Sequence, residues 1–311
     1  MKAMEKSIFL SIMKQFYLLI ILVFALGQKG CTPTEGALTK SDSIPSQSFK
    51  DYWFDGNAEI SSYQLKQSRY GALREGQAVL IYVTEDFYPN TQVKADQKTK
   101  KVKPVLKLNR QKKFLTGIYP YSVMTSSFTY IEWEPFLAKV SASLQEWCGH
   151  SYLQLNQRGQ INIQSHSYFE GEADQKIGLS KNTMTEDELW NRVRLNPDKL
   201  PLGIFALLPS LELIRLNHWP LKTVPVTAQL RNEGEVSTYE IDFESLGRTL
   251  SIHFQTQHPH RIEGWVDRSE KGEVYTSIAT RMKTQKLPYW QLNTPGDERY
   301  RDSLKLVTQS G

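Results

Sequence analysis

The sequence has few of the features from which a chemistry is usually assigned. Only two cysteines are present, Cys31 and Cys148, so a framework of several disulfides is excluded and stability must come from a conventional core. No His-Glu-x-x-His, Cys-x-x-Cys or Gly-x-Ser-x-Gly motif occurs, which leaves out familiar signatures of zinc proteases, thiol redox proteins and serine hydrolases. The net charge of +5 is modest, and we expect no nucleic-acid partner.

Long apolar runs are equally scarce. The longest covers residues 16–26, follows a lysine-rich start, and is shorter than the roughly 20 apolar residues that span a bilayer. Its length suits the h-region of a secretory signal. Gly30 and Cys31 follow directly, at the place where a bacterial lipoprotein is cut and acylated, so we predict a signal peptide over residues 1–30 and a lipid on Cys31. The alternatives are a plain signal peptide or an N-terminal anchor helix with an incidental cysteine.

The remaining chain predicts one domain on a tether. Residues 31–50 are polar and contain prolines, which indicates a flexible tether that starts at the acylated Cys31. Residues 51–308 are rich in segments where apolar and polar residues alternate, as in 136–147, and this period indicates β-strands. The connections in the C-terminal part are short, so neighbouring strands there should be antiparallel.

Helix signals are concentrated in a helical insertion near residues 185–217. Thr185 and Glu188 have the spacing of a capping box, and residues 210–217 can form a second short helix. The predicted fold is therefore mainly β, with a large twisted antiparallel sheet, open or half-barrel, covered by a few short helices. Two packed β-sheets are the alternative.

One predicted hairpin gathers side chains that could carry chemistry. Residues 147–155 and 161–168 alternate in polarity, and Gly159 would supply the left-handed position of a three-residue loop. The register that pairs Leu153 with Ile163 places the apolar residues on one face and the polar residues on the other. The candidate catalytic or binding residues on and just beyond the polar face are Cys148, His150, Tyr152, His166, Tyr168 and Glu170.

This polar face admits two interpretations. The same register sets His150 opposite His166, so these two could hold a metal, or Cys148 could act as a nucleophile with a histidine base. The ordinary alternative is the polar side of a sheet, where the imidazoles make cross-strand hydrogen bonds. No cofactor is expected.

Residues 94–113 form a predicted basic loop between two strands. A patch for anionic headgroups or acidic glycans is one interpretation, and a solvated hairpin that keeps a sheet edge soluble is the other. Its basic residues include Lys98, Lys100, Lys101, Lys103, Arg110 and Lys112.

Several segments, among them Tyr-Trp-Phe-Asp-Gly-Asn at residues 52–57 and Ser-His-Ser-Tyr-Phe-Glu-Gly-Glu at 165–172, resemble a family of Bacteroidota lipoproteins. That family is of unknown function, although its members often carry the name "septum formation inhibitor Maf". True Maf proteins are cytoplasmic nucleotide pyrophosphatases with a Ser-x-Ser-Pro-Arg-Arg signature, which this chain lacks, so no Maf residue is carried over. The strand pattern of the C-terminal part also resembles the open barrels of periplasmic lipoprotein carriers.

We expect a lipid-anchored cell-envelope protein that binds a hydrophobic ligand or a partner protein. In terms of the resemblance, no acidic run of the kind associated with surface display follows Cys31, so the expected location is the outer membrane, facing the periplasm. The alternatives are an exported hydrolase that uses the Cys148, His150 and His166 face, and a structural scaffold of the envelope.

Overall fold

A computed structural model describes residues 39–40, 45–97, 99–134, 136–270 and 275–306. The chain divides into two compact units, Met1–Ala37 and Leu38–Gly311, and all the described residues belong to the second. The predicted signal peptide and Cys31 lie outside the described residues. Among the residues described, no helix is both long and apolar enough to cross a bilayer.

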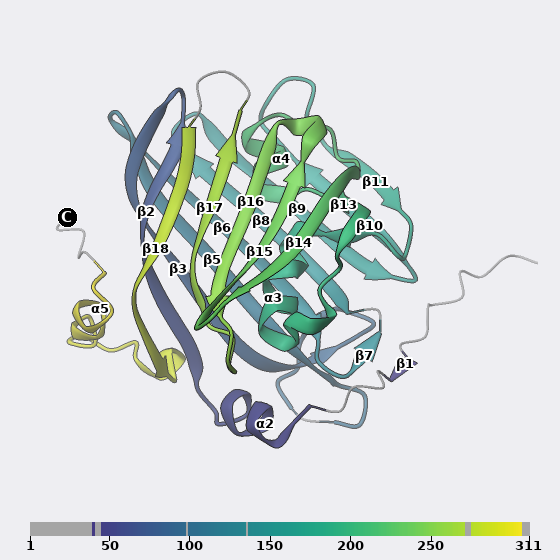
Figure 1. Cartoon of the computed structure of the whole chain (residues 1–311), viewed down its shortest axis with the longest axis vertical. Helices are drawn as coiled ribbons and strands as arrows, with labels where there is room; N and C mark the ends of the chain where they lie inside the picture. The colour runs from purple at the N-terminus through teal and green to yellow at the C-terminus, as the bar shows by residue number, and fades with distance from the viewer. Residues whose placement is uncertain (1–38, 41–44, 98, 135, 271–274, 307–311) are drawn as a thin grey trace, which may run out of the picture. The chain divides into compact units, whose positions relative to one another are not determined.

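The mainly β prediction is confirmed. Within the described part of the chain, sixteen strands form one sheet that stays open, with β11 at one edge and β12 at the other (Figure 1). All pairs are antiparallel except β12 with β13, which is parallel. The first half of the chain supplies β2 (Ala58–Arg69), β3 (Ala72–Tyr88), β4 (Val93–Lys94), β5 (Lys103–Thr116), β6 (Tyr119–Tyr130), β8 (Leu137–Glu146), β9 (Gly149–Arg158), β10 (Gln160–His166) and β11 (Gln175–Leu179). The second half supplies β12 (Met184–Thr185), β13 (Gly203–Leu208), β14 (Val224–Glu233), β15 (Val236–Phe243), β16 (Arg248–Gln255), β17 (Ile262–Ser269) and β18 (Tyr275–Leu287).

Smaller elements complete the fold. Strands β1 (Thr39–Lys40) and β7 (Trp133–Glu134) pair with each other apart from the large sheet. The helices are α2 (Gln47–Trp53), α3 (Glu186–Leu195), α4 (Leu211–Leu216) and α5 (Arg299–Ser303), with short 3-10 turns η1 (Pro197–Lys199), η2 (Glu244–Leu246) and η3 (Tyr289–Gln291). Helix α2 begins within the segment predicted as tether, where Ser46 accepts a hydrogen bond from the Phe49 amide as N-cap.

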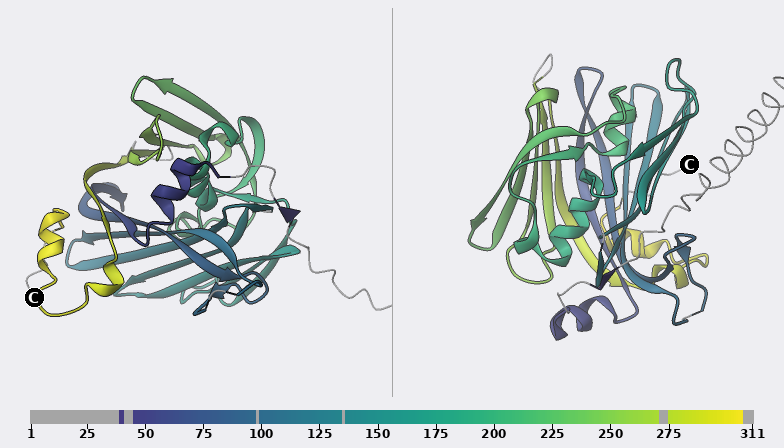
Figure 2. Two further views of the ribbon diagram at one scale, coloured as in Figure 1. Left: turned by 90° about the horizontal axis from the view of Figure 1, so that it is seen from below. Right: turned by 90° about the vertical axis from the view of Figure 1, so that its right-hand side faces the viewer.

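The sheet curves around α3 and α4, which lie inside its concave face (Figure 2). The predicted capping box is present, because Thr185 accepts from the Glu188 amide and the Glu188 side chain accepts from the Thr185 amide. Trp190 on α3 packs edge-on against Trp265 of β17, with ring centroids 5.3 Å apart. The apolar core therefore lies between the helices and the inner face of the sheet. Strand β13, which pairs with β14, falls within the segment predicted to be a helical insertion.

The predicted basic loop is much shorter than expected. Strand β5 already begins at Lys103, and Arg110 and Lys112 are only 4% and 6% exposed. The interpretation of these two residues as solvated loop residues is wrong. They have the same parity as Leu106 and Leu108, so the pleat turns all four side chains toward the core.

The predicted hairpin of β9 and β10 is confirmed, and Gly159 at its turn has a φ of +77°. The predicted register is wrong by two residues, because Leu155 rather than Leu153 lies opposite Ile163. The turn is tighter than the predicted three-residue loop, since Gly159 alone separates the two strands. A shift of two leaves every side chain on its expected face, so alternation could not detect it.

Candidate ligand-binding site

Of the sequence-predicted site residues, Cys148 lies in the turn before β9, and Tyr168 and Glu170 lie in the segment after β10. His150, Tyr152 and His166 lie on the outer face of the β9–β10 hairpin. The residues between them, such as Ser151 and Leu153, are buried against the core, so the alternating side chains point away from it. Tyr152 is partly buried, and its hydroxyl donates to Gln154 at 2.7 Å. The exposed members of the set are Cys148, His150, His166, Tyr168 and Glu170.

The two histidines have separate partners. His166 lies opposite Tyr152 rather than His150, and its Nδ1 is 2.9 Å from Asp174 Oδ1. His150 Nε2 is 2.9 Å from the Ser143 hydroxyl. Within the described ranges, no group of three or more His, Cys, Asp or Glu side chains is placed to hold a metal ion.

The thiol of Cys148 has a raised pKa, which disfavours the nucleophilic thiolate. A hydrogen bond with Glu146 raises the pKa of the Cys148 thiol, and the charge of that carboxylate acts in the same direction. A reactive cysteine needs the opposite shift, because the thiolate is the nucleophile.

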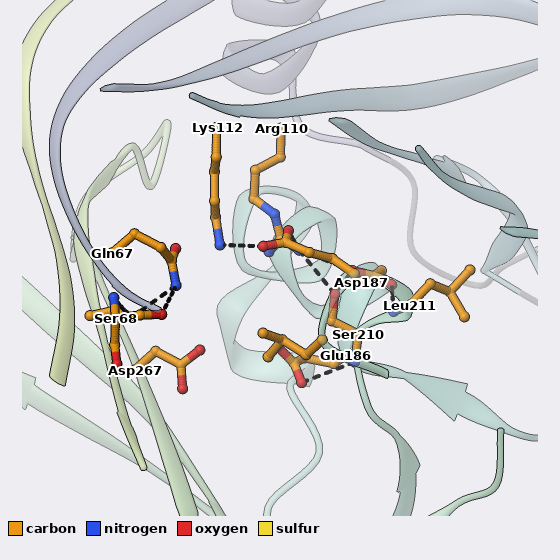
Figure 3. Close-up of polar contacts among 12 residues, drawn as sticks. Gln67, Ser68, Arg110, Lys112, Glu186, Asp187, Ser210, Leu211 and Asp267 are labelled. Carbon is orange, nitrogen blue, oxygen red and sulfur yellow. Dashed lines mark hydrogen bonds and ion pairs between the residues drawn. The ribbon is translucent and has the colours of Figure 1, made fainter. Parts of the chain in front are cut away.

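The interior holds an ion network that the sequence interpretation missed (Figure 3). Arg110 of β5 donates to Asp187 at 3.1 Å, and Lys112 donates to Glu212 of α4 at 2.8 Å. The Ser210 hydroxyl, which precedes α4, also donates to Asp187 at 2.7 Å. The network thus ties α3 and α4 to β5.

A second branch ties α3 to the other half of the sheet. Arg248 of β16 contacts both oxygens of Glu186, at 2.6 and 2.9 Å, and donates to Asp267 of β17 at 2.7 Å. Glu186 and Arg248 are buried, and removal of one partner from such a pair leaves an uncompensated charge in the core. The one sequence signal for this network is that Arg110 and Lys112 follow Leu106 and Leu108 at every second position of β5. No such signal marks the other residues of the network.

The carboxylates of the network differ in pKa. Burial opposes ionisation of Glu186, but Arg248 outweighs it and lowers the pKa of that carboxyl. Burial raises the pKa of Asp187; Arg110 counteracts part of this shift, and Glu186 adds to it. The two adjacent carboxyls of α3 are therefore shifted in opposite directions, with the pKa of Asp187 raised and that of Glu186 lowered.

A cleft of about 330 Å³ opens beside α2 and α3, and we call it the α2–α3 cleft. Its lining surface is more apolar than polar, and both kinds of side chain contribute to it. The apolar part consists of Pro45, Phe49, Ile131, Phe136, Leu195 and Pro197, and the polar part of Ser46, Ser48, Arg192, Asn196, Asp198, Lys199, His258 and His260.

A buried ion pair positions the histidine turn of this cleft. Arg194 of α3 binds Glu59 of β2 through two contacts of 2.6 and 2.7 Å. Its remaining Nε donates to the carbonyl of Pro259 at 3.0 Å, which places His258 and His260 beside α3. The His258 and His260 rings have centroids 6.0 Å apart.

His258 has a polar side-chain atom without a partner in the described chain. Its Nε2 is buried and has no hydrogen-bond partner among the residues described. Burial lowers the pKa of His258, and the charges of His260 and Arg194 lower it further, so the ring is neutral near pH 7. The residues that meet in the cleft are far apart in the sequence, so no local pattern could have assembled them.

Together these features define an open, helix-filled β half-barrel with a cleft suited to a small molecule. No protein-family model matches the chain, and no curated protein sequence matches it. Among solved structures, the chain is similar to a β-barrel-like protein from Brucella abortus with a domain of unknown function, DUF1849. The identity is 7% and the TM-score 0.46, over 74% of this chain and 98% of that chain.

Proposed function

We propose that this is a lipid-anchored protein of the cell envelope whose α2–α3 cleft binds a hydrophobic ligand. The observation that carries the proposal is a cleft of about 330 Å³ with a mainly apolar lining beside the buried, unpartnered Nε2 of His258. Small-molecule sites have this composition, with mostly apolar walls and a few polar groups that fix orientation, and volumes from about 300 Å³.

The chemistry of the cleft narrows the class of ligand. Phe49, Phe136 and Leu195 offer apolar contact, whereas a buried polar atom without a partner carries a free-energy cost that a ligand group can remove. A neutral imidazole nitrogen can donate or accept, depending on its tautomer. The expected ligand is therefore mainly apolar and carries one polar group. Because His258 Nε2 has almost no accessible surface, a hydrogen bond to it requires the ring to turn toward the cleft.

The tether supports a location close to the membrane. The cleft includes Pro45 and Ser46, which directly follow the segment that would run from an acylated Cys31. Residues 31–38, which precede β1, reach at most about 30 Å when extended. An apolar ligand that leaves a bilayer would meet the cleft end of the domain first.

The anchor is tested by Cys31→Ser in the full chain. The expected result is a protein that stays unprocessed or becomes soluble and lacks the mass of the acyl chains. A variant that fractionates with membranes and has the same mature mass as the wild type would contradict the anchor.

The cleft is tested by photolabelling of the full chain in membranes with an uncharged aryl diazirine, followed by peptide mapping. Adducts are expected on α2 and on the segment that contains Leu195. Ser48→Trp places a ring at the cleft and should remove most of these adducts. Thr227→Trp, at an exposed position of β14, is the matched control. Labelling of the cleft peptides that is equal in all three proteins would contradict the proposal.

A further inference from the structure

Two further pockets lie beside α4, which is at the opposite end of the domain from α2 in Figure 1. They have volumes of about 170 and 340 Å³, and both are lined by Arg69, Tyr70 and Leu216. We call the smaller one the arginine pocket, because Arg215 also lines it. The α2–α3 cleft shares no lining residue with the arginine pocket, whereas the predicted hairpin contributes Gly149 and Ser151 to it.

Arg69 is a cation held by neutral groups. Its Nη1 donates to the carbonyl of Leu216 at 2.7 Å, and its Nη2 donates to the hydroxyls of Tyr70 and Tyr121 at 3.2 and 3.3 Å. Its Nε is buried and has no hydrogen-bond partner in the part of the chain that the structure describes. Among the described residues, no carboxylate forms a salt bridge with Arg69, so its charge has no counterion there.

Arg215 provides a second guanidinium with donors to spare. Its Nε donates to the Ser151 hydroxyl at 2.9 Å, and its planar group lies 3.6 Å from the centre of the Phe169 ring. Within the described part of the chain, neither Nη atom has a hydrogen bond. Burial lowers the pKa of Arg215, Glu172 opposes this shift, and the charge of Arg69 adds to it. The two cations therefore interact across the pocket.

The carboxylates nearby are already engaged. Glu172 lies 3.6 Å from Arg215 Nε, but its oxygens also contact the His218 ring and the Ser167 hydroxyl. Glu146 accepts from the Cys148 amide at 2.6 Å. Glu146 and Glu172 balance the charges of Arg69 and Arg215 in number, so binding of an anion depends on direct contact with the free Nη atoms of Arg215. A dianion would meet more repulsion from these two carboxylates than a monoanion.

The backbone holds one wall of the pocket in an uncommon conformation. Tyr70 and Gly71, in the β2–β3 turn, have φ values of +53° and +69°, as the central residues of a type I′ turn require. A tyrosine is rarely found with positive φ. Here the conformation places the Tyr70 ring 4.2 Å from the guanidinium of Arg69, and such outliers cluster at functional sites.

We propose that the arginine pocket binds the carboxylate of a small organic acid, with Arg69 and Arg215 as its anchors. The Arg215 guanidinium, whose face is covered by Phe169, keeps both Nη atoms free for the two oxygens of a carboxylate. The donors of Arg69 are engaged or buried, so Arg69 contributes a positive charge without a salt-bridge partner among the described residues. The rings of Tyr121 and Phe169 and the side chain of Leu144 offer apolar contact to the body of the acid.

Benzoate and its uncharged isostere benzamide are suitable probes, titrated calorimetrically into the full chain in detergent. The wild type should bind benzoate at least about tenfold more tightly than benzamide, as expected for the loss of one charge-assisted hydrogen bond. Arg215→Gln and Arg69→Gln should each weaken benzoate binding by about tenfold or more, with little effect on benzamide.

Two control variants test whether benzoate binding depends on the arginine pocket. Arg231→Gln removes a distant exposed arginine that pairs with Glu240, and Ser48→Trp alters only the α2–α3 cleft, so both should bind benzoate as the wild type does. Arg69 also contacts α4, so loss of its side chain can destabilise the fold. The comparison of benzoate with benzamide is made in the wild type and does not depend on the Arg69 variant. No benzoate binding, equal affinity for both probes, or unchanged affinity in Arg215→Gln would overturn the proposal.

Discussion

Glu59 and Arg194 form a bidentate ion pair with contacts of 2.6 and 2.7 Å, and neither side chain is more than 1% exposed. The guanidinium lies between the rings of Trp53 and Tyr82, 4.8 and 4.6 Å from their centres. The pair joins α3 to β2, and Arg194 also holds the turn at Pro259. A charged pair thus supports one side of the apolar cleft.

Removal of one member of this pair should be strongly destabilising. Arg194→Met leaves the Glu59 carboxylate buried without its counterion, and we expect a loss of about 3–5 kcal/mol in the free energy of unfolding. The double variant Glu59→Leu with Arg194→Met removes both charges and should recover much of that loss. Urea denaturation of the three proteins tests this, and a double variant no more stable than Arg194→Met would contradict it.

Asp187 and Glu186 should give opposite pH dependences of stability. The folded-state pKa of Asp187 is raised, so its stabilising contribution is complete below the unfolded pKa of about 3.9 and is lost as pH rises through the folded pKa. The folded-state pKa of Glu186 is lowered, so its contribution is present above the unfolded pKa of about 4.3 and is lost as pH falls through the folded pKa.

The measurement is the difference in unfolding free energy between wild type and each amide variant as a function of pH. Relative to Asp187→Asn, the wild type should lose stability as pH increases from acid. Relative to Glu186→Gln, it should lose stability as pH decreases. Parallel curves for the two variants would show that the two carboxylates titrate alike.

Gly159 tests the hairpin turn. Its φ of +77° lies in the left-handed region, where a side chain costs roughly 1–2 kcal/mol. Gly159→Ala should therefore destabilise by about this amount. Gly178→Ala is the control, because Gly178 lies in the neighbouring edge strand β11, and a Cβ there would have nothing within 4 Å. Equal melting temperatures for the two variants would be inconsistent with the turn described.

This hairpin also shows what a sequence can predict. Alternation located β9 and β10, and the need for positive φ located Gly159, because both are local properties. The pairing partner of Ile163 was not predictable, since Leu153 and Leu155 satisfy the same alternation. The buried positions of Arg110 and Lys112 were missed because lysine and arginine are seldom buried, although their parity with Leu106 indicated the inner face.

The candidate sites were harder to predict from local sequence pattern than the hairpin was. The α2–α3 cleft joins Phe49, Leu195 and His258, which come together only through the curvature of the sheet and the insertion of α3. The predicted His150 and His166 pairing failed because it depended on a register that alternation fixes only to a multiple of two.

The reactivity of Cys148 distinguishes an ordinary surface thiol from a catalytic nucleophile. Because Glu146 raises its pKa, its alkylation should require a higher pH than an ordinary thiol with a pKa of about 8.5. Glu146→Gln should move the alkylation profile to lower pH, whereas His150→Ala should leave it unchanged. The rate of iodoacetamide labelling against pH provides the test. A wild-type profile centred well below that of an ordinary thiol, and dependent on His150, would support the exported-hydrolase alternative.

The most direct measurement for the central proposal is the amount of apolar compound that organic solvent extracts from the purified full chain, in moles per mole of protein. Wild type and Thr227→Trp should retain comparable amounts of a mainly apolar compound, and Ser48→Trp, prepared in parallel, should retain far less. Equal amounts in all three proteins, or none in the wild type, would contradict a hydrophobic ligand in the α2–α3 cleft.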